Sequence, residues 1–340
     1  RHSDQEHIYA TMPPDMYISL LLLVVGFILL IKGADFLVEG SASIARRLGI
    51  SSLVIGLTIV AFGTSAPELV VNIIASAQGN TDLAIGNVLG SNISNTLLVL
   101  GVAALIYPII VKESTIWKEI PFSLLAVIIL FLMANDVLID GSDISRISRS
   151  DGLIMLGFFA VFVVYLTNMA KKGILDPGLD HEHIDIEPAW TSSMKIIVGI
   201  IGLTLGGKWI VDGAITWGEI LGFSEAFMGL TVLAIGTSLP ELATAVIAAR
   251  KKHPDIVIGN VIGSNIFNIL LVLAVTSTIT PLDFSIDLNH DITMVVVTTF
   301  LLLIFILQGD GDKKNKLLRW QGVIFISIYA SYLGYLVYRG

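Results

Sequence analysis

The feature that most constrains the fold is a long internal duplication. Residues 56–75 read GLTIVAFGTSAPELVVNIIA, and residues 229–248 read GLTVLAIGTSLPELATAVIA. A second pair follows at the same offset of 173: GNVLGSNISNTLLVL over 86–100 and GNVIGSNIFNILLVL over 259–273, identical at 12 of 15 positions. Each copy places one Glu, one Pro and several hydroxyl or amide side chains inside apolar runs. The chain is therefore expected to fold as two similar halves with matched polar groups.

Apolar runs recur along the chain at lengths that span a bilayer. Hydrophobic residues make up 54% of the sequence and charged residues 14%, against about 25% charged in a typical soluble domain. About 20 apolar residues cross a hydrocarbon layer of ~30 Å. Ten such runs are predicted, at 16–39, 51–77, 83–107, 120–138, 152–170, 194–213, 224–249, 256–280, 291–308 and 320–338. The sequence predicts an all-α, multi-pass membrane protein of ten transmembrane helices in the lipid bilayer of the cell membrane.

The distribution of positive charge predicts the orientation. With the N-terminus outside, 14 Lys and Arg residues fall in the inward loops and 4 in the outward segments, as the positive-inside rule requires. Five spans in each half make the second half enter from the opposite side, so we expect an N-out/C-out pair of inverted five-helix repeats, a recurring transporter architecture. The predicted units are an external tail (1–15), a first repeat (16–170), an inward linker (171–193) and a second repeat (194–340).

Composition excludes several classes of function. The net charge of −8 lies on short loops without a basic patch for nucleic acid, and the absence of Cys excludes disulfides and thiolate chemistry. In the linker, His181-Glu182-His183 is read as solvated sequence in preference to a weak metal site. An enzyme is disfavoured because HExxH is absent and Ser65 lacks a visible base, whereas an ion channel is left for flux measurements to decide. No cofactor and no obligate protein partner are expected.

The first copy of the motif places its polar groups together. Four residues lie at i, i+3, i+4 and i+7, on one helical face: Ala61, Thr64, Ser65 and Glu68. Pro67 lacks the N–H that would bond the Gly63 carbonyl. Such disruption is tolerated at membrane depth only where protein or a hydrated cavity supplies new partners. One wall is thus expected to offer a carboxylate, two hydroxyls and loosened carbonyls.

The second copy repeats this wall, and the following span of each half adds hydroxyls and amides. The additional candidates are Ala234, Thr237, Ser238, Glu241, Ser91, Asn95, Ser264 and Asn268. All-oxygen surroundings suit Ca²⁺, which takes 6–8 oxygen ligands, and the six His lie in predicted loops or tails. Two carboxylates match a divalent charge. Because burial and mutual repulsion favour protonation of such a pair in the absence of a cation, protons are expected competitors.

Other polar and small residues receive structural interpretations. Gly86/Gly90 and Gly259/Gly263 are small-xxx-small pairs that let helices approach closely. Lys32 and Asp35, at i and i+3 in the first span, are interpreted as structural pairing or snorkelling. Neither feature demands a role in transport.

The paired motifs GTSAPE…GNVLGSNISN and GTSLPE…GNVIGSNIFN resemble the two α-repeats of the cation/Ca²⁺ exchanger superfamily, most of all its sodium/calcium exchanger branch. The resemblance covers both repeats and nearly the whole chain. It implies Na⁺/Ca²⁺ antiport by alternating access, with the first and sixth spans sliding across a rigid eight-helix core. About three Na⁺ would exchange for one Ca²⁺, which moves net charge and makes transport electrogenic.

The resemblance also implies roles for residues. Glu68 and Glu241 would ligate Ca²⁺ with the carbonyls of Thr64 and Thr237. Na⁺ would use positions built from Ala61, Ser65, Ser91, Ala234, Ser238 and Ser264. Family members with Asp at the position of Asn268 are associated with K⁺ transport, so Asn95 and Asn268 together favour K⁺-independent exchange. Exchange of H⁺ for Ca²⁺ is the alternative, although those exchangers usually carry a GNxxE-type repeat.

Overall fold

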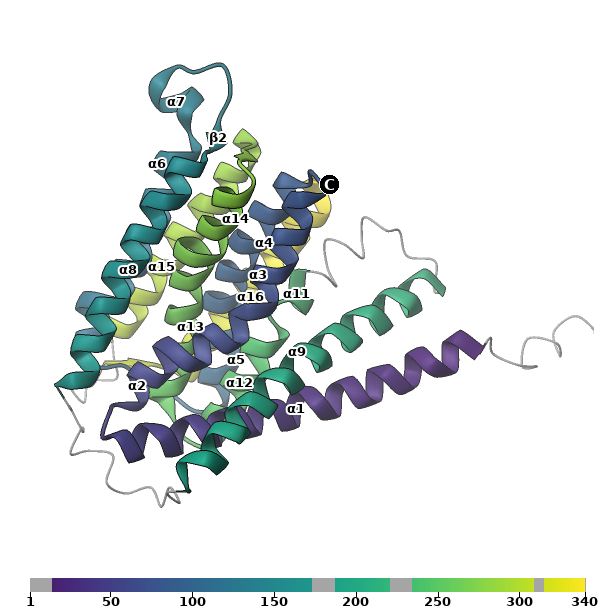
Figure 1. Cartoon of the computed structure of the whole chain (residues 1–340), viewed down its shortest axis with the longest axis vertical. Coiled ribbons are helices and arrows are strands. Elements are labelled where there is room, and N and C mark those ends of the chain that lie inside the picture. Colours follow the sequence, from purple (N-terminus) through teal and green to yellow (C-terminus); the bar gives the residue numbers. More distant parts are fainter. Residues whose placement is uncertain (1–13, 173–186, 221–233, 309–314, 340) are drawn as a thin grey trace, which may run out of the picture.

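The computed structural model describes residues 14–172, 187–220, 234–308 and 315–339 and is almost entirely helical (Figure 1). Within these ranges, nine helical stretches are long and apolar enough to cross a membrane. They correspond to nine of the ten runs expected from the sequence. The remaining run, 224–249, falls partly outside the described residues, and its described part forms α11 (Ala234–Gly236) and α12 (Leu239–Arg250).

The first half is a series of helices joined by short connections. Its elements are α1 (Pro14–Leu48), α2 (Ser52–Ile55), η1 (Gly56–Val60), α3 (Ala61–Ala77), α4 (Thr81–Ser94), η2 (Asn95–Val99), α5 (Leu100–Ile106), β1 (Ile109–Ile110), η3 (Thr115–Glu119), α6 (Ile120–Ala134), α7 (Asp136–Asp140), β2 (Arg146–Ile147) and α8 (Arg149–Lys171). The segments η1, η2 and η3 are π-helical turns. Such turns often accompany functional sites.

The second half follows the same plan. It contains α9 (Ala189–Ile220), α11, α12, α13 (Pro254–Phe267), η6 (Asn268–Leu273), α14 (Ala274–Ile279), β3 (Leu282–Asp283), η7 (Ile286–Leu288), α15 (Asn289–Gln308), β4 (Lys316–Leu317) and α16 (Arg319–Arg339). The π-helical turns η2 and η6 begin at Asn95 and Asn268, which are equivalent positions of the duplication.

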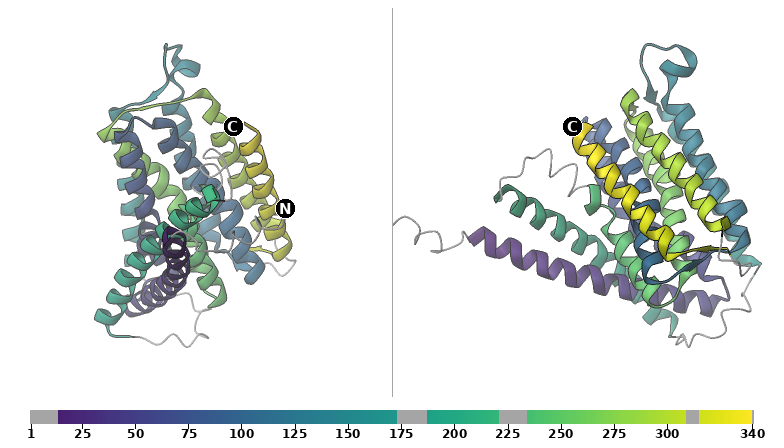
Figure 2. Two further views of the ribbon diagram at one scale, coloured as in Figure 1. Left: turned by 90° about the vertical axis from the view of Figure 1, so that its right-hand side faces the viewer. Right: turned by 180° about the vertical axis from the view of Figure 1, so that it is seen from behind.

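Helices α1 and α9 lie side by side and lean away from the other helices (Figure 2). A Cβ on Gly33 would lie 2.8 Å from the Gly199 carbonyl oxygen, and a Cβ on Gly199 would lie 2.8 Å from that of Gly33. Gly26 and Gly206 repeat this reciprocal approach at 3.0 and 2.7 Å. Only glycine lets two helix backbones come this close. Gly26 is equivalent to Gly199, and Gly33 is equivalent to Gly206. The two contacts are therefore related to each other as a two-fold axis between the halves would relate them.

The centre of the molecule is formed by α3, α4, α12 and α13. Both α3 and α13 contact each of the other three helices. The helical stretch Pro254–Ile279 comprises α13, η6 and α14, and 94% of its most apolar 18-residue segment is buried inside the protein. A Cβ on Gly259 would lie 2.8 Å from the Leu53 carbonyl oxygen, and one on Gly263 would lie 2.7 Å from Ala61 Cβ. The close-packing interpretation is therefore confirmed for this glycine pair. It does not hold for Gly86 and Gly90, where a Cβ would meet no atom of the described residues within 4 Å.

Two short antiparallel sheets lie at opposite ends of the bundle. β1 pairs with β4, and β2 pairs with β3. β1 and β3 are equivalent positions of the duplication, yet β1 follows α5 at the lower end of Figure 1, whereas β2 and its partner β3 lie by α7 at the upper end. Equivalent segments thus lie at opposite ends, so the halves run through the bundle in opposite directions.

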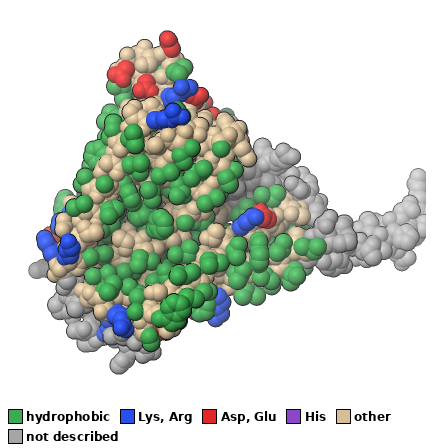
Figure 3. Space-filling model, in the orientation of Figure 1, with side chains coloured by type: hydrophobic (Ala, Val, Ile, Leu, Met, Phe, Trp, Pro, Cys, Tyr) green, Lys and Arg blue, Asp and Glu red, His purple; other side chains and the backbone are tan. Residues whose placement is uncertain are grey.

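Hydrophobic side chains cover much of the face of the molecule shown in Figure 3. Charged side chains gather at the top and along the left and lower margins of this face, and others lie at mid-height on the right. Hydrophobic side chains cover much of the area between them. On α8, Leu153 and Val164 are 59% and 57% exposed. An apolar surface of this kind is suited to contact with hydrocarbon rather than water.

Candidate functional site

The repeated GTSxPE motif adopts two different backbone structures. In the first half, α3 stays helical through Pro67. In the second half, α11 ends at Gly236, a turn covers Thr237 and Ser238, and α12 begins at Leu239. Pro240 falls in the first turn of α12, where its missing N–H leaves no helical bond unmade. The bond to the Gly63 carbonyl that Pro67 cannot make is therefore lost within a continuous helix, whereas the backbone of the second copy turns at Thr237 and Ser238.

Glu68 and Glu241 are both buried, at 0% and 1% exposure, and they lie close enough to interact electrostatically in the centre of the molecule. Ser65 Oγ donates to Glu241 Oε1 at 3.4 Å, so a hydroxyl of one half reaches the acid of the other. The hydroxyls of Thr64 and Ser264 also lie beside Glu241. In contrast, neither carboxylate oxygen of Glu68 has a hydrogen-bond partner on another described residue. Buried oxygens of this kind call for an explanation, and an ion site is one.

Hydroxyl groups from the two halves meet in reciprocal pairs. Thr64 Oγ1 lies 3.3 Å from Ser264 Oγ, and Thr237 Oγ1 lies 3.4 Å from Ser91 Oγ. Thr237 is the equivalent of Thr64, and Ser91 is the equivalent of Ser264. The same contact is therefore made twice, with the roles of the two halves exchanged. The two walls predicted from the sequence therefore interleave across the centre.

Two amides complete the oxygen-rich centre. Asn95 Nδ2 donates to Asn265 Oδ1 at 3.1 Å, and Asn268 Nδ2 donates to Asn92 Oδ1 at 3.1 Å. Within the described part of the chain, the Oδ1 atoms of Asn95 and Asn268 have no hydrogen-bond partner. Since each amide uses its nitrogen to hold the other half, its oxygen is left available.

The remaining predicted members are placed as follows. The Ala61 carbonyl accepts from Thr64 Oγ1 at 3.3 Å, and the Ser238 hydroxyl is buried without a partner among described residues. Ala234 begins α11, but its side chain lies outside the described part. The His181-Glu182-His183 segment also lies outside the described residues.

Sequence reasoning missed several polar residues that hold this centre together. Thr64 Oγ1 donates to Asn260 Oδ1 at 3.0 Å, and Asn265 Nδ2 donates to Thr96 Oγ1 at 3.1 Å. Asn92, Asn260 and Asn265 all belong to the duplicated GNxxGSN pattern. Their identical recurrence in both halves was the available signal.

The donor set is that of a hard cation. In the described ranges, no group of three or more His, Cys, Asp or Glu side chains is arranged to hold a metal ion. The centre instead offers two carboxylates with hydroxyl, amide and carbonyl oxygens. Such ligands suit Na⁺-like and Ca²⁺-like ions and not zinc or copper.

A cluster of ion pairs ties α1 to α9 and α12. Lys251 Nζ lies 2.5 Å from Asp35 Oδ1 and 2.6 Å from Glu39 Oε1. Lys195 Nζ lies 3.0 Å from Glu39 Oε2 and also pairs with Glu187. Asp35 thus has a partner on α12, distant in sequence. We call these five residues the ionic cluster.

His253 lies just beyond the end of α12, two residues from Lys251. Burial and the charge of Lys251 lower the pKa of His253 below its usual value. The imidazole is therefore neutral near pH 7 and adds no charge to the ionic cluster.

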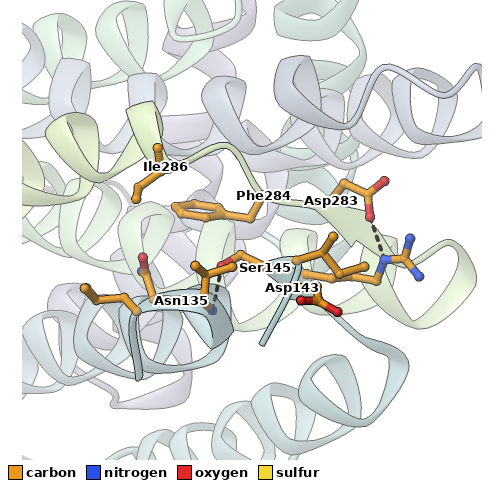
Figure 4. A pocket seen from close by; sticks show the side chains of 10 residues that line it. Asn135, Asp143, Ser145, Asp283, Phe284 and Ile286 are labelled. Carbon is orange, nitrogen blue, oxygen red and sulfur yellow. Dashed lines mark hydrogen bonds and ion pairs between the residues drawn. The ribbon is translucent and has the colours of Figure 1, made fainter. Parts of the chain in front are cut away.

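A separate cavity of about 560 Å³ lies at the upper end of the molecule (Figure 4). Its lining comes from the segment around α7 and from β2 and β3, and includes Asn135, Asp143 and Phe284. Arg146 Nε lies 2.5 Å from Asp283 Oδ1 on its wall, and this contact raises the pKa of Arg146. None of the predicted site residues lines this cavity.

Comparisons with known proteins identify the family. The model of the family described as "Sodium/calcium exchanger protein" matches residues 18–168 and 192–338. Sodium/calcium exchanger MaX1 of Methanosarcina acetivorans is 32% identical over 351 residues, covering 94% of this chain and 99% of that protein. Inner membrane protein YrbG of Escherichia coli is 40% identical over 274 residues, covering 78% and 81%.

A solved structure shares the fold. The sodium-calcium exchanger NCX_Mj, in a crystal soaked with zero Na⁺ and Ca²⁺, has a TM-score of 0.78 and 34% sequence identity, covering 94% of this chain and 99% of that one. The apolar surface and these relatives make the chain a multi-pass membrane protein. Since the family model spans both halves, the chain belongs to the sodium/calcium exchanger family of cation transporters.

Proposed function

We propose that this protein is an Na⁺/Ca²⁺ antiporter that uses the Na⁺ gradient to move Ca²⁺ across the cell membrane. The observation that carries the proposal is the meeting of Glu68 and Glu241, one buried acid from each half, in a centre made of oxygen ligands. Two carboxylates neutralise one Ca²⁺, and flexible oxygen surroundings are what this ion prefers. The names of the relatives support the same ions.

The proposed ion ligands are the twelve residues of the two motifs. Glu68 and Glu241 would bind Ca²⁺ with the carbonyl groups of Thr64 and Thr237. Na⁺ would occupy overlapping positions formed by Ala61, Ser65, Ser91, Ala234, Ser238 and Ser264, with Asn95 and Asn268 supplying amide oxygens. Overlap makes the two ions compete, and competition for one site is the basis of exchange.

The proposed stoichiometry is about three Na⁺ per Ca²⁺, without K⁺. Three monovalent ions against one divalent ion move one net charge in each cycle, so transport is electrogenic. The centre has two acids and two neutral amides, and Asn268 stands where K⁺-associated family members carry Asp. A site with one fewer negative charge is less suited to an additional cation.

We further propose ten spans with both termini outside, arranged as two inverted repeats, 16–170 and 194–340. The reciprocal contacts of the α1–α9 pair and the opposite placement of β1 and β3 support the inverted relation. The tenth span would be formed by 224–249. The excess of Lys and Arg in the loops at one end supports the orientation.

Alternating access would use α1 and α9 as one moving unit. Their glycine contacts join them backbone to backbone, whereas they meet α12 through the ionic cluster. The pairs of Lys251 are partly exposed, so water can replace them at a small cost. The cluster is therefore suited to hold one end of the unit against α12 in one state and to release it in another.

The test is ion flux in vesicles containing the purified protein. Vesicles loaded with Na⁺ and diluted into choline medium with radioactive Ca²⁺ should take up Ca²⁺, and K⁺-loaded vesicles should not. An inside-positive potential should accelerate uptake because net positive charge leaves with Na⁺. Uptake driven by a pH gradient alone would instead support H⁺/Ca²⁺ exchange, and Ca²⁺ flux without any counter-ion would indicate a channel. Folded protein with no Ca²⁺ flux under a Na⁺ gradient would refute the proposal.

A further inference from the structure

Four buried asparagines form two hydrogen-bonded chains between the halves. In the first chain, Asn268 Nδ2 donates to Asn92 Oδ1 at 3.1 Å, and Asn92 Nδ2 donates to the backbone oxygen of Asn265 at 3.2 Å. In the second chain, Asn95 Nδ2 donates to Asn265 Oδ1, and Asn265 Nδ2 donates to Thr96 Oγ1, both at 3.1 Å. All these residues are at most 2% exposed. The chains therefore fix how the amides can turn.

The first chain has a fixed direction. A backbone carbonyl can only accept a hydrogen bond, whereas an amide side chain has a donor end and an acceptor end. Asn92 must therefore turn its nitrogen toward the Asn265 carbonyl and its oxygen toward Asn268. Asn268 must therefore point its nitrogen at Asn92 Oδ1, which leaves its own Oδ1 facing away from these hydrogen-bonded amides. Turning either amide over would set two acceptors against each other in a buried place, which is costly.

The second chain has no fixed direction. It ends on the hydroxyl of Thr96, and a hydroxyl both donates and accepts. Asn265 and Asn95 can turn over together, with Thr96 donating instead of accepting, and every bond is still made. The residue equivalent to Thr96 in the second half is Ile269, which has no hydroxyl. The difference between the chains therefore follows from one difference between the repeats.

We infer that Asn92 is a positioning residue that locks Asn268 as a permanent oxygen ligand, whereas Asn95 can present either its oxygen or its nitrogen. This inference rests on the proposed ion site. The segment η6, which begins with Asn268, packs against α3, and η2, which begins with Asn95, packs against α12. A locked oxygen serves a cation in every state. A reversible amide can offer oxygen to a cation and N–H to a carboxylate once the cation has left.

The decisive experiment is a pair of double-mutant cycles on Ca²⁺ binding by the purified full chain, with Na⁺ competition recorded in parallel. Asn92→Ala should weaken Ca²⁺ binding about tenfold, the effect of one buried hydrogen bond, and should have no further effect when Asn268→Ala is present. Asn265→Ala keeps the backbone carbonyl, so it should couple to Asn95→Ala and not to Asn268→Ala. The matched controls are the crossed pairs, Asn92→Ala with Asn95→Ala and Asn265→Ala with Asn268→Ala, because substitutions at independent sites have additive effects.

A second measurement uses substitutions of nearly equal shape. The Asn268→Asp carboxyl group would face the locked oxygen of Asn92 and needs a proton to bond with it. The Asn95→Asp carboxyl group would face Asn265, which can turn its nitrogen toward it. Lowering the pH by one unit should therefore reduce the Ca²⁺ affinity of Asn268→Asp about tenfold more than that of the wild type. The same pH change should reduce the Ca²⁺ affinity of Asn95→Asp little more than that of the wild type.

The possible outcomes separate the two proposals. Wild-type protein that binds no Ca²⁺ would refute the ion site itself. Wild-type binding with additive effects of Asn92→Ala and Asn268→Ala, or with equal coupling in the crossed pairs, would refute only the positioning role. Equal pH dependence of the two Asp variants would also refute it. Thermal unfolding of the ion-free variants checks that they fold, and if the Ala variants do not, the two Asp variants decide.

Discussion

In the first copy of the repeat, the motif runs as one helix through Pro67, and Glu68 has no hydrogen bond to another described residue. In the second copy, the chain breaks at Thr237 and Ser238, and Glu241 accepts a bond from the opposite half. The letters GTSxPE are shared, but the backbone and the partners of the acid are not. The comparison teaches that the duplicated letters bring the same groups to the centre, while their neighbours decide how each group is held.

The halves also match closely elsewhere, which gives the comparison an internal control. Thr64 with Ser264 and Thr237 with Ser91 are the same contact made twice. Gly33 and Gly206 make the same close approach in the α1–α9 pair. Substitutions at matched contacts should have equal effects, and those at unmatched contacts should not.

The largest effect is expected from removing either acid. Glu68→Gln and Glu241→Gln should each reduce Ca²⁺ uptake by at least about 100-fold, because a buried divalent ion loses one of its two opposite charges. Uptake into Na⁺-loaded vesicles measures this, with Glu113→Gln in an exposed connection as the control. Near-normal uptake in one of the two variants would mean that only one half supplies the site.

The glycine contacts should respond equally in the two halves. Gly33→Ala and Gly206→Ala would place a Cβ within 2.7 Å and 2.6 Å of backbone atoms of the facing helix, and overpacking of this kind costs about 1–3 kcal/mol. Each should lower the Ca²⁺ exchange rate about tenfold. Gly157→Ala, where a Cβ has open space, should leave the rate unchanged. Unequal effects of the first two would contradict the reciprocal packing.

The two prolines should behave differently. Ala in place of Pro240 restores an N–H that can bond the Gly236 carbonyl and join α11 to α12, so the turn should close and exchange should slow several-fold. Pro67→Ala leaves α3 helical as before and should change the rate less. Turnover in vesicles, together with amide hydrogen exchange over 234–241, tests this. Equal slowing by both substitutions would count against a role of the break.

A smaller difference is expected between the serines of the two motifs. Both Ser65→Ala and Ser238→Ala should weaken Na⁺ competition by a few-fold, about the value of one hydrogen bond. Only Ser65→Ala removes a bond to Glu241, so only this variant should also change the thermal stability of the ion-free protein. Unfolding curves without Na⁺ and Ca²⁺ distinguish the two. A stability change of the same size in both would remove the distinction between the acids.

The smallest effect concerns the turns that follow the two motif helices. Gly79 and Lys252 are equivalent positions, and both adopt positive φ, 83° and 58°. A non-glycine residue pays for this conformation with about 1 kcal/mol of strain. Lys252→Gly should therefore raise the free energy of unfolding by about 0.5–1 kcal/mol, and Gly79→Ala should lower it by a similar amount. Denaturant unfolding of detergent-solubilised protein measures both, and a loss of stability in Lys252→Gly would show that the Lys252 side chain contributes more than its strain costs.

Much of the fold could be predicted because apolar runs of bilayer length mark helices directly. The span predicted at 152–170 corresponds to the helix Arg149–Lys171, and the span predicted at 320–338 corresponds to the helix Arg319–Arg339. The grouping of Glu68 with Glu241 followed from the duplication, since equivalent polar groups must meet where inverted halves meet. These features depend on patterns longer than a single contact.

The details depended on contacts that no pattern reveals. The partner of Asp35 is Lys251, 216 positions away in the chain, and only the packing of α1 on α12 brings them together. The break at Thr237 could not be distinguished from unbroken α3, because both copies have the same Thr-Ser and the same Pro-Glu. The direction of the amide chains depends on the difference between Thr96 and Ile269. This difference could be interpreted only after the structure placed Asn265 beside Thr96.

One consequence concerns the mechanical state of the carrier. Glu68 and Glu241 belong to different halves, so a bound cation would connect the halves through both acids, and its departure would remove that connection. A ligand at 100 times its dissociation constant stabilises a protein by about 2.7 kcal/mol. Melting temperature should thus climb with the logarithm of Ca²⁺ concentration, and the loosest form of the molecule should be the one that carries no cargo.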